Sequence, residues 1–190
     1  MTRVPVTPDT HHLAVIDMQV VFADPASKWA TPRFAEILPR VQELAAALAP
    51  QVTLTRFVAP ATPTGAWHDY YAQWPFALQP PDAALYDVVD GLPSAPTVSA
   101  TTFSKWGPEL AAAIGSRTLV LAGVSTDCCV LSTALAAADA GARVQVVADA
   151  CAGADDRSHG ASLALMALYA PLIEVVDAAT VLTGLPAAPR

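Results

Sequence analysis

Two adjacent cysteines, Cys128 and Cys129, lie where the sequence predicts the start of a helix. The apolar run 118–122 indicates a buried strand, Gly123 begins a polar turn, and an alanine-rich stretch follows the cysteines. The partial positive charge at a helix N-terminus stabilises a thiolate, which is the nucleophilic form of cysteine. A cysteine in this position is therefore a candidate for covalent catalysis, provided that a base and an oxyanion site lie near it.

Asp17 is a second candidate for chemistry, because it ends the apolar run 13–16 that predicts the first strand. A carboxylate at the end of a buried strand lies at the edge of the sheet, in a cleft that is partly shielded from water. Such a carboxylate is a suitable general base for a thiol.

The elements that must position these residues alternate between strand and helix. Strands are predicted at 13–17, 52–58, 96–99, 118–122, 143–148 and 172–176. Helices are predicted from Thr31 as N-cap and Pro32 in the first turn to residue 48, at 108–114, at 126–140, around 158–169, and after a cap at Asp177. This alternation predicts an α/β protein, a three-layer α/β/α fold with a mostly parallel, Rossmann-like central sheet, in which ligands bind beyond the carboxyl ends of the strands.

Residues 59–95 break this alternation, since they are rich in proline and aromatic residues and contain no clear strand. A loop of this length in a compact domain is usually functional, so we expect a lid or pocket wall with a short helix at 67–73. The alternative is that its aromatic side chains are core or subunit contacts. Our candidates for the substrate pocket lie in this loop or near the ends of motifs, and they are Phe22, Trp67, Tyr71, Trp74 and Trp106.

Composition limits the class of protein. The 190 residues are expected to form one domain, 1–190, and 54% hydrophobic residues with 14% charged ones argue against a disordered chain. No apolar run approaches the roughly 20 residues of a membrane span, and a net charge of −7 argues against nucleic acid as a partner.

Because the three cysteines form no disulfide framework and the N-terminus has no signal-like core, we expect a cytoplasmic protein. We expect it to act on a small molecule as a homodimer or homotetramer.

Three motifs together resemble the isochorismatase-like cysteine hydrolases, a family that includes nicotinamidases and N-carbamoylsarcosine amidohydrolase. The motifs are Val-Ile-Asp-Met-Gln at 15–19, Phe-Ser-Lys-Trp-Gly at 103–107 and Gly-Val-Ser-Thr-Asp-Cys-Cys-Val-Leu-Ser-Thr-Ala-Leu at 123–135. They follow one another in the family's order, at the ends of predicted strands, and the similarity runs from about 13 to 176.

The resemblance implies a catalytic triad of Asp17, Lys105 and Cys129. It also implies a cis peptide between Val124 and Ser125, with the backbone N–H groups of Ser125 and Cys129 forming an oxyanion hole. Lysine is more often a surface charge, but one close to both other groups would hold the thiolate and orient the carboxylate.

Other residues of the motif have alternative interpretations. Adjacent helical residues point about 100° apart, so we expect only one of Cys128 and Cys129 to face the strand ends. The family pattern Thr-Asp-x-Cys-Val selects Cys129. Thr126 and Asp127 are interpreted as helix caps, Cys151 as structural, and none of the four histidines is assigned a catalytic role.

One stretch departs from the nicotinamidase pattern. Nicotinamidases carry an Asp-x-His metal motif after the second strand, whereas residues 56–60 read Arg-Phe-Val-Ala-Pro. We therefore expect no metal and no cofactor, and we expect hydrolysis of an amide or ureido C–N bond. One alternative is hydrolysis of an isochorismate-type vinyl ether, in which Arg33 and Arg56 are the candidates to bind the carboxylates of the substrate. The other alternative is a non-catalytic ligand-binding protein of the same fold.

Overall fold

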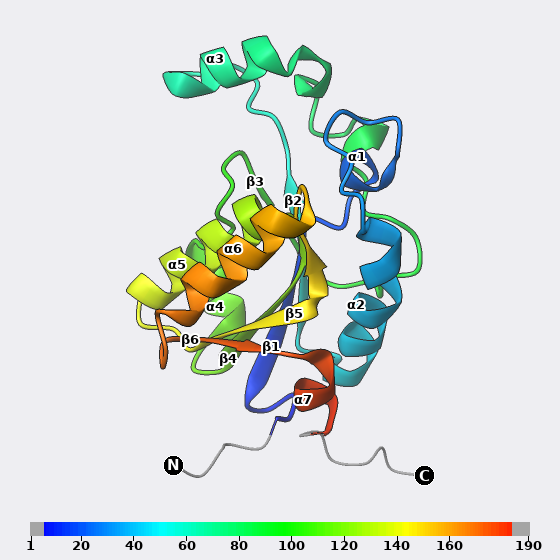
Figure 1. Ribbon diagram of the computed structural model, residues 1–190. Coiled ribbons are helices and arrows are strands. Elements are labelled where there is room, and N and C mark those ends of the chain that lie inside the picture. Colours follow the sequence, from blue (N-terminus) through cyan, green and yellow to red (C-terminus); the bar gives the residue numbers. More distant parts are fainter. Residues whose placement is uncertain (1–5, 184–190) are drawn as a thin grey trace.

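The computed structural model describes residues 6–183 and is built around a six-stranded parallel sheet. The strands are β1 (His11–Ile16), β2 (Val52–Phe57), β3 (Thr97–Ala100), β4 (Thr118–Val124), β5 (Val144–Ala152) and β6 (Ile173–Val176). They lie in the order β3-β2-β1-β4-β5-β6 (Figure 1). The chain thus proceeds outward from β1 in one direction and then from β4 in the other, so a crevice is expected beyond the carboxyl ends of β1 and β4.

The central strands are buried on both faces, which explains their nearly continuous apolar sequences. In β1, Leu13 and Val15 belong to one hydrophobic cluster, whereas Ala14 and Ile16 belong to another on the opposite face. Side chains of a strand point alternately to its two faces, so one run of apolar residues supplies both layers of the core.

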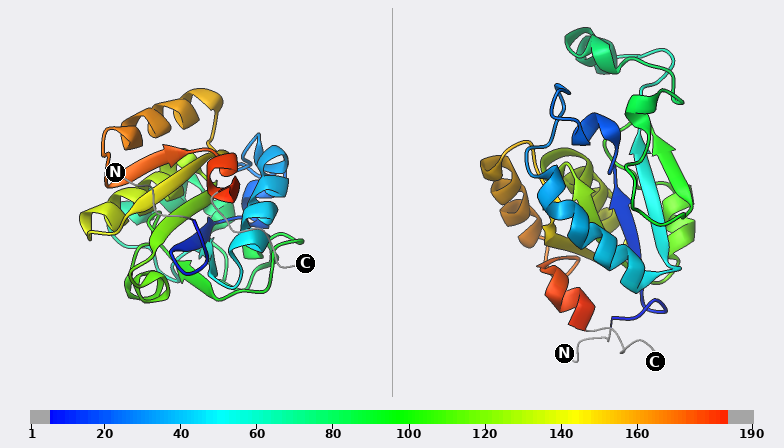
Figure 2. Two further views of the ribbon diagram at one scale, coloured as in Figure 1. Left: turned by 90° about the horizontal axis from the view of Figure 1, so that it is seen from below. Right: turned by 90° about the vertical axis from the view of Figure 1, so that its right-hand side faces the viewer.

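Helices cover both faces of this sheet (Figure 2, left). On one face lie α2 (Phe34–Leu48) and α7 (Ala178–Thr183), and on the other lie α4 (Pro108–Ile114), α5 (Leu131–Asp139) and α6 (Asp156–Ala167). The predicted three-layer α/β/α fold is therefore confirmed, with a sheet that is parallel throughout. Among residues 6–183, no helix has both the length and the apolar character to cross a membrane.

Several boundaries differ from those predicted. The helix α2 begins at Phe34 with Arg33 as its N-cap, because Thr31 and Pro32 form a turn in which the Thr31 carbonyl accepts from the Phe34 N–H. The predicted helix 126–140 is divided into η3 (Thr126–Val130), a π-helical turn, and α5. The strand β5 continues to Ala152, beyond its predicted end at 148, and its register with β4 shifts between Leu121 and Gly123. A short helix, α1 (Val20–Ala23), was not predicted.

Residues 59–86 extend beyond the carboxyl ends of the strands, and the rest of the segment, up to residue 95, returns past α2 to the start of β3 (Figure 1). The segment 59–95 contains α3 (Ala66–Gln73) and two short 3-10 helices, η1 (Pro75–Ala77) and η2 (Ala84–Tyr86), so the predicted short helix is confirmed. A small cluster that includes Val58, Tyr71 and Tyr86 anchors the segment. Within it, the Tyr86 hydroxyl donates to the carbonyl of Ala77 and accepts from the N–H of Ala59.

Candidate active site

A buried ion pair lies at the carboxyl end of β1. Lys105 Nζ is 2.9 Å from Asp17 Oδ2, and both side chains are 0% exposed. Asp17 has a φ of 48°, in the left-handed region that residues other than glycine seldom adopt. Backbone conformations of this kind occur preferentially at functional sites, where the surrounding structure enforces them.

The ammonium group of Lys105 has a partner for each of its three donor positions. Besides the Asp17 carboxylate, Nζ donates to the backbone carbonyls of Thr102 at 2.9 Å and Phe103 at 3.2 Å. It also lies 4.9 Å from the centroid of the Phe57 ring. A buried charge is tolerated only with such partners, so the position of the ammonium is fixed.

Thr55 holds the other oxygen of the Asp17 carboxylate. Its hydroxyl donates to Asp17 Oδ1 at 2.6 Å and accepts the backbone N–H of Asp17 at 3.1 Å. Thr55 was not among the predicted site residues, and the one signal for it in the sequence is its place as a polar side chain in a buried strand.

Cys129 is buried in η3, next to this ion pair. Burial raises the pKa of its thiol well above the ordinary value, and the charge of Asp17 and a hydrogen bond with it raise the pKa further, whereas Lys105 lowers it. The stabilisation of a thiolate that the helix start suggests is therefore outweighed. A thiol whose pKa is raised, with the carboxyl group of Asp17 beside it, is the arrangement that general-base activation requires.

Thr133 connects the backbones of Lys105 and Cys129. Its hydroxyl donates to the Cys129 carbonyl at 2.6 Å and accepts the Lys105 N–H at 2.9 Å. Thr133 lies four residues after Cys129, within the motif that carries the family resemblance, but it was not among the predicted site residues.

The turn after β4 brings its backbone close to β1. Gly123 has a φ of 121°, and a Cβ there would lie 2.1 Å from the carbonyl oxygen of Ile16, so only glycine fits. The Val124–Ser125 peptide is cis. The Ser125 carbonyl accepts from the N–H groups of Cys128 and Val130, both at 3.1 Å.

Thr126 and Asp127 do not cap the helix, contrary to prediction. Thr126 Oγ1 lies 2.9 Å from His159 Nδ1, and Asp127 Oδ1 accepts from Ser125 Oγ at 2.5 Å and from the Ala154 N–H at 2.9 Å. Thr126 contacts α6 and Asp127 contacts Ser125 and the loop after β5, and neither side chain accepts from the first N–H groups of the helix.

Cys151 is buried and its thiol lies 3.8 Å from the carbonyl oxygen of Leu121. Burial raises the pKa of the Cys151 thiol to about 12. These surroundings are those of an inert structural cysteine.

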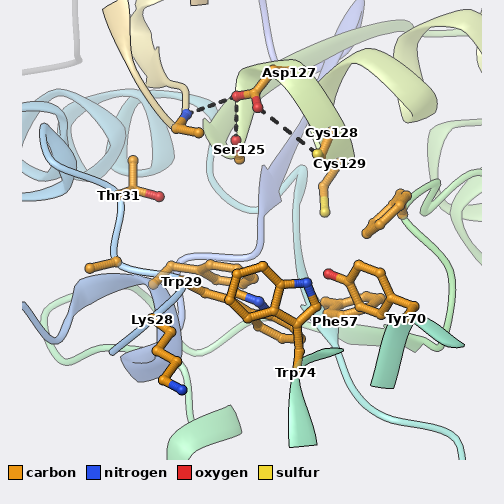
Figure 3. Close-up of a pocket in the computed structure, with 14 residues that line it drawn as sticks. Lys28, Trp29, Thr31, Phe57, Tyr70, Trp74, Ser125, Asp127, Cys128 and Cys129 are labelled. Carbon is orange, nitrogen blue, oxygen red and sulfur yellow. Dashed lines mark hydrogen bonds between the residues drawn. The ribbon is translucent and has the colours of Figure 1, made fainter. Parts of the chain in front are cut away.

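A cavity of about 410 Å³ lies beside Cys129. In Figure 3, the residues of the turn, Ser125, Asp127, Cys128 and Cys129, lie on one side of the cavity, and aromatic rings lie on the opposite side. Both cysteines line the cavity, so the expectation that only one would face the strand ends is wrong. They differ in their surroundings, because Cys129 lies beside Asp17 and Lys105, whereas Cys128 Sγ lies 4.0 Å from Asp127 Oδ2.

Two of the five predicted pocket residues, Phe22 and Trp74, line the cavity. The other three do not. Trp67 packs behind the lining, with its ring centroid 5.1 Å from that of Phe103, and Tyr71 is buried in the cluster that anchors the segment 59–95. Trp106 packs against the hydrophobic core on the α4 and α5 face of the sheet.

Most of the aromatic wall of the cavity was not predicted; it is formed by Trp29, Phe57, Tyr70 and Phe103 together with the two predicted residues. Trp29 is at its centre, since its ring lies between 5.1 and 6.3 Å from five other aromatic rings. Trp29 follows a polar, proline-containing stretch, and such surroundings give no sign that its ring is half-buried. Desolvation raises the pKa of Tyr70, whose hydroxyl therefore stays neutral at the wall.

Among the described residues, Lys28 is the only cationic side chain that lines the cavity. The two arginines considered for a carboxylated substrate make other contacts. Arg33 Nε lies 2.8 Å from Glu36 Oε2, and Arg56 Nε donates to Ser99 Oγ at 3.1 Å. Over the range 6–183, no group of three or more His, Cys, Asp or Glu side chains is placed to hold a metal ion.

Comparison with known proteins gives one family and several similar folds. The model of the isochorismatase domain matches residues 11–180. A crystal structure of a cysteine hydrolase from Pseudomonas syringae pv. phaseolicola 1448A has a TM-score of 0.81 and 22% identity, over 97% of this chain and 96% of that one. An isochorismatase-like hydrolase from Alkaliphilus metalliredigens has a TM-score of 0.78 and 19% identity, over 92% and 98% of the two chains. An N-carbamoylsarcosine amidase from Thermoplasma acidophilum has a TM-score of 0.71 and 20% identity, over 89% and 96%. No curated protein matches the chain significantly.

Proposed function

The chain belongs to the isochorismatase family, and from this premise we propose that it is a cysteine hydrolase that cleaves an amide or ureido C–N bond of a small molecule through a thioester. The observation that carries the proposal is the Asp17–Lys105 ion pair, fully buried and adjacent to the Cys129 thiol at the wall of a cavity. A buried base, a fixed cation and a thiol in contact with substrate space are the parts that nucleophilic catalysis by cysteine requires.

In the first half of the reaction, Asp17 accepts the proton of the Cys129 thiol as sulfur attacks the carbonyl carbon of the substrate. Lys105 stabilises the negative charge that moves from the carboxylate to sulfur, because its charge favours the thiolate. The backbone N–H groups of Ser125 and Cys129 hold the oxyanion of the tetrahedral intermediate. A single donor of this kind contributes about 3 kcal/mol to stabilisation of the transition state.

In the second half, Asp17 donates the same proton to the departing nitrogen as the C–N bond breaks. An amine, or ammonia from a primary amide, leaves, and a thioester with Cys129 remains. Asp17, again a carboxylate, then removes a proton from water, which attacks the thioester. The acid is released, and the proton returns to the Cys129 sulfur.

The cavity wall supports a substrate whose acyl part is largely apolar. Six aromatic side chains line it, and these are Phe22, Trp29, Phe57, Tyr70, Trp74 and Phe103. Proteins of similar fold include a cysteine hydrolase and an N-carbamoylsarcosine amidase, and the second name agrees with cleavage of a C–N bond.

The proposal is tested by incubating the protein with a panel of small amides and ureido acids. Rapid acid quenching followed by intact-mass and peptide mass spectrometry should detect an acyl adduct on Cys129 together with release of ammonia or amine. The Cys129→Ala variant is the control and should form neither adduct nor product. Hydrolysis by this variant at the parent rate would exclude the thioester route.

A further inference from the structure

Asp127 lines the cavity, but the proposed mechanism gives it no step. Its Oδ1 accepts two hydrogen bonds, from Ser125 Oγ at 2.5 Å and from the Ala154 N–H at 2.9 Å (Figure 3). Ser125 directly follows β4, and Ala154 lies just after β5. One carboxylate oxygen therefore connects the carboxyl ends of two neighbouring strands, through hydrogen bonds of the strong, charge-assisted kind.

The loop after β5 is shaped to accept this carboxylate. A Cβ at Gly153 would lie 2.7 Å from Asp127 Oδ1 and 3.1 Å from the backbone nitrogen of His159. A side chain at position 153 would thus displace the carboxylate, the start of α6, or both. The close approach of the loop to Asp127 depends on glycine at this position.

Ser125 is held from two sides. Asp127 binds its hydroxyl, and the N–H groups of Cys128 and Val130 bind its carbonyl. Because the side chain and the carbonyl of Ser125 are both held, its Cα and the backbone nitrogen bonded to that Cα are held in place, which restrains the N–H that this nitrogen carries.

We propose that Asp127 is a positioning residue that keeps the Ser125 N–H directed into the cavity, where it binds the oxyanion. This inference rests on the proposed function, because only a reaction that passes through an oxyanion requires that donor. Asp127 acts through Ser125 and exchanges no proton with substrate.

Two reagents that react with the same sulfur separate this role from general damage to the site. Acylation of Cys129 by 4-nitrophenyl acetate passes through a tetrahedral oxyanion, whereas alkylation by iodoacetamide displaces iodide at a saturated carbon and forms none. Asp127 is not among the groups that shift the pKa of Cys129, so its removal should leave the reactivity of the thiol itself unchanged. Both rates are measured at one pH, and peptide mass spectrometry assigns each adduct to Cys129.

In the Asp127→Ala variant we expect acylation to slow by about 10- to 100-fold, less than the 10²- to 10³-fold loss when an oxyanion donor is removed outright. Alkylation should stay within about twofold of the parent rate, since no oxyanion donor contributes to it.

The Asp127→Asn variant keeps an acceptor oxygen at the same place and should recover most of the acylation rate. The Gly153→Ala variant should reproduce part of the loss with Asp127 intact. Asp139→Ala, which removes an exposed carboxylate at the end of α5, is the matched control and should behave as the parent.

Three results would overturn the inference. The first is acylation at the parent rate in Asp127→Ala. The second is an equal loss of acylation and alkylation in Asp127→Ala while circular dichroism shows that it remains folded. The third is a loss in Asp127→Ala that is confined to the apparent affinity for the ester. The last would make Asp127 a direct substrate contact. Failure of the proposed function would look different, because the Cys129→Ala variant would then release nitrophenolate as fast as the parent, whatever the result at Asp127.

Discussion

Replacing Thr55 with valine tests how the Asp17 carboxylate is held. The Thr55 hydroxyl donates to Asp17 Oδ1 at 2.6 Å and accepts the Asp17 N–H at 3.1 Å. Valine has nearly the same shape but no hydroxyl, so both hydrogen bonds are lost while the packing of β2 is kept. The Asp17 carboxylate, which is 0% exposed, gains no water in exchange.

The size of the effect follows from these contacts. A hydrogen bond to a charged group contributes about 1.5–3 kcal/mol, and a buried N–H left without an acceptor costs about 1–3 kcal/mol. Because one hydroxyl makes both bonds, the two terms overlap, and we expect the free energy of unfolding in urea to fall by about 2–4 kcal/mol. A misplaced general base slows chemistry, so kcat for amide hydrolysis should fall by about 10- to 100-fold.

Thr53→Val is the matched control. Thr53 is buried on the same strand, its side chain points to the same face as that of Thr55, and its hydroxyl lies 2.9 Å from His12 Nε2. This variant should lose about 1 kcal/mol of stability for a neutral hydrogen bond and keep the parent kcat. If Thr55→Val kept kcat within about twofold of the parent, or if both variants lost it equally, the assignment of Thr55 to the support of Asp17 would be refuted.

Three further predictions concern the nucleophile and its surroundings. Cys129→Ala should abolish hydrolysis and Cys128→Ala should leave most of it, because only Cys129 lies beside Asp17 and Lys105; equal losses in two folded variants would contradict the assignment. Lys105→Ala should slow alkylation of Cys129 near neutral pH and move its pH midpoint upward, since Lys105 lowers the pKa of that thiol; a midpoint that does not move would show that the cation has no influence on sulfur. Hydrolysis should survive exhaustive chelation, and elemental analysis that finds one metal ion per chain would overturn that expectation.

Much of the fold could be predicted because it depends on local patterns. Alternating strands and helices gave the layers, and α4 has the predicted bounds because Pro108 and Gly115 mark its two ends. The start of α2 was misplaced, because the local signal of Thr31 and Pro32 is satisfied by a turn that precedes the helix. Local signals thus indicate which elements exist more reliably than where each begins.

The site was predictable only where a short motif carries it. Thr55 and Asp17 are 38 residues apart and meet through the pairing of β1 with β2, which no local pattern shows. The aromatic wall around Trp29 likewise gathers residues from several loops. The acidity of Cys129 is a third case. Its position in the sequence suggests stabilisation of the thiolate and a lowered pKa, whereas burial, which only the fold reveals, raises the pKa of the thiol.

The central claim, that Asp17 moves the proton between Cys129 and the substrate nitrogen, is tested most directly by the Asp17→Asn variant. Iodoacetamide alkylation of Cys129 and hydrolysis of an amide are both measured against pH for the parent and this variant. Asp17 raises the pKa of the thiol, so its neutralisation should move the alkylation midpoint to lower pH and make alkylation faster near neutral pH. Hydrolysis should nevertheless be lost, because no group remains to protonate the leaving nitrogen. Amide hydrolysis by Asp17→Asn near the parent rate would contradict the account and assign the proton transfer to another residue.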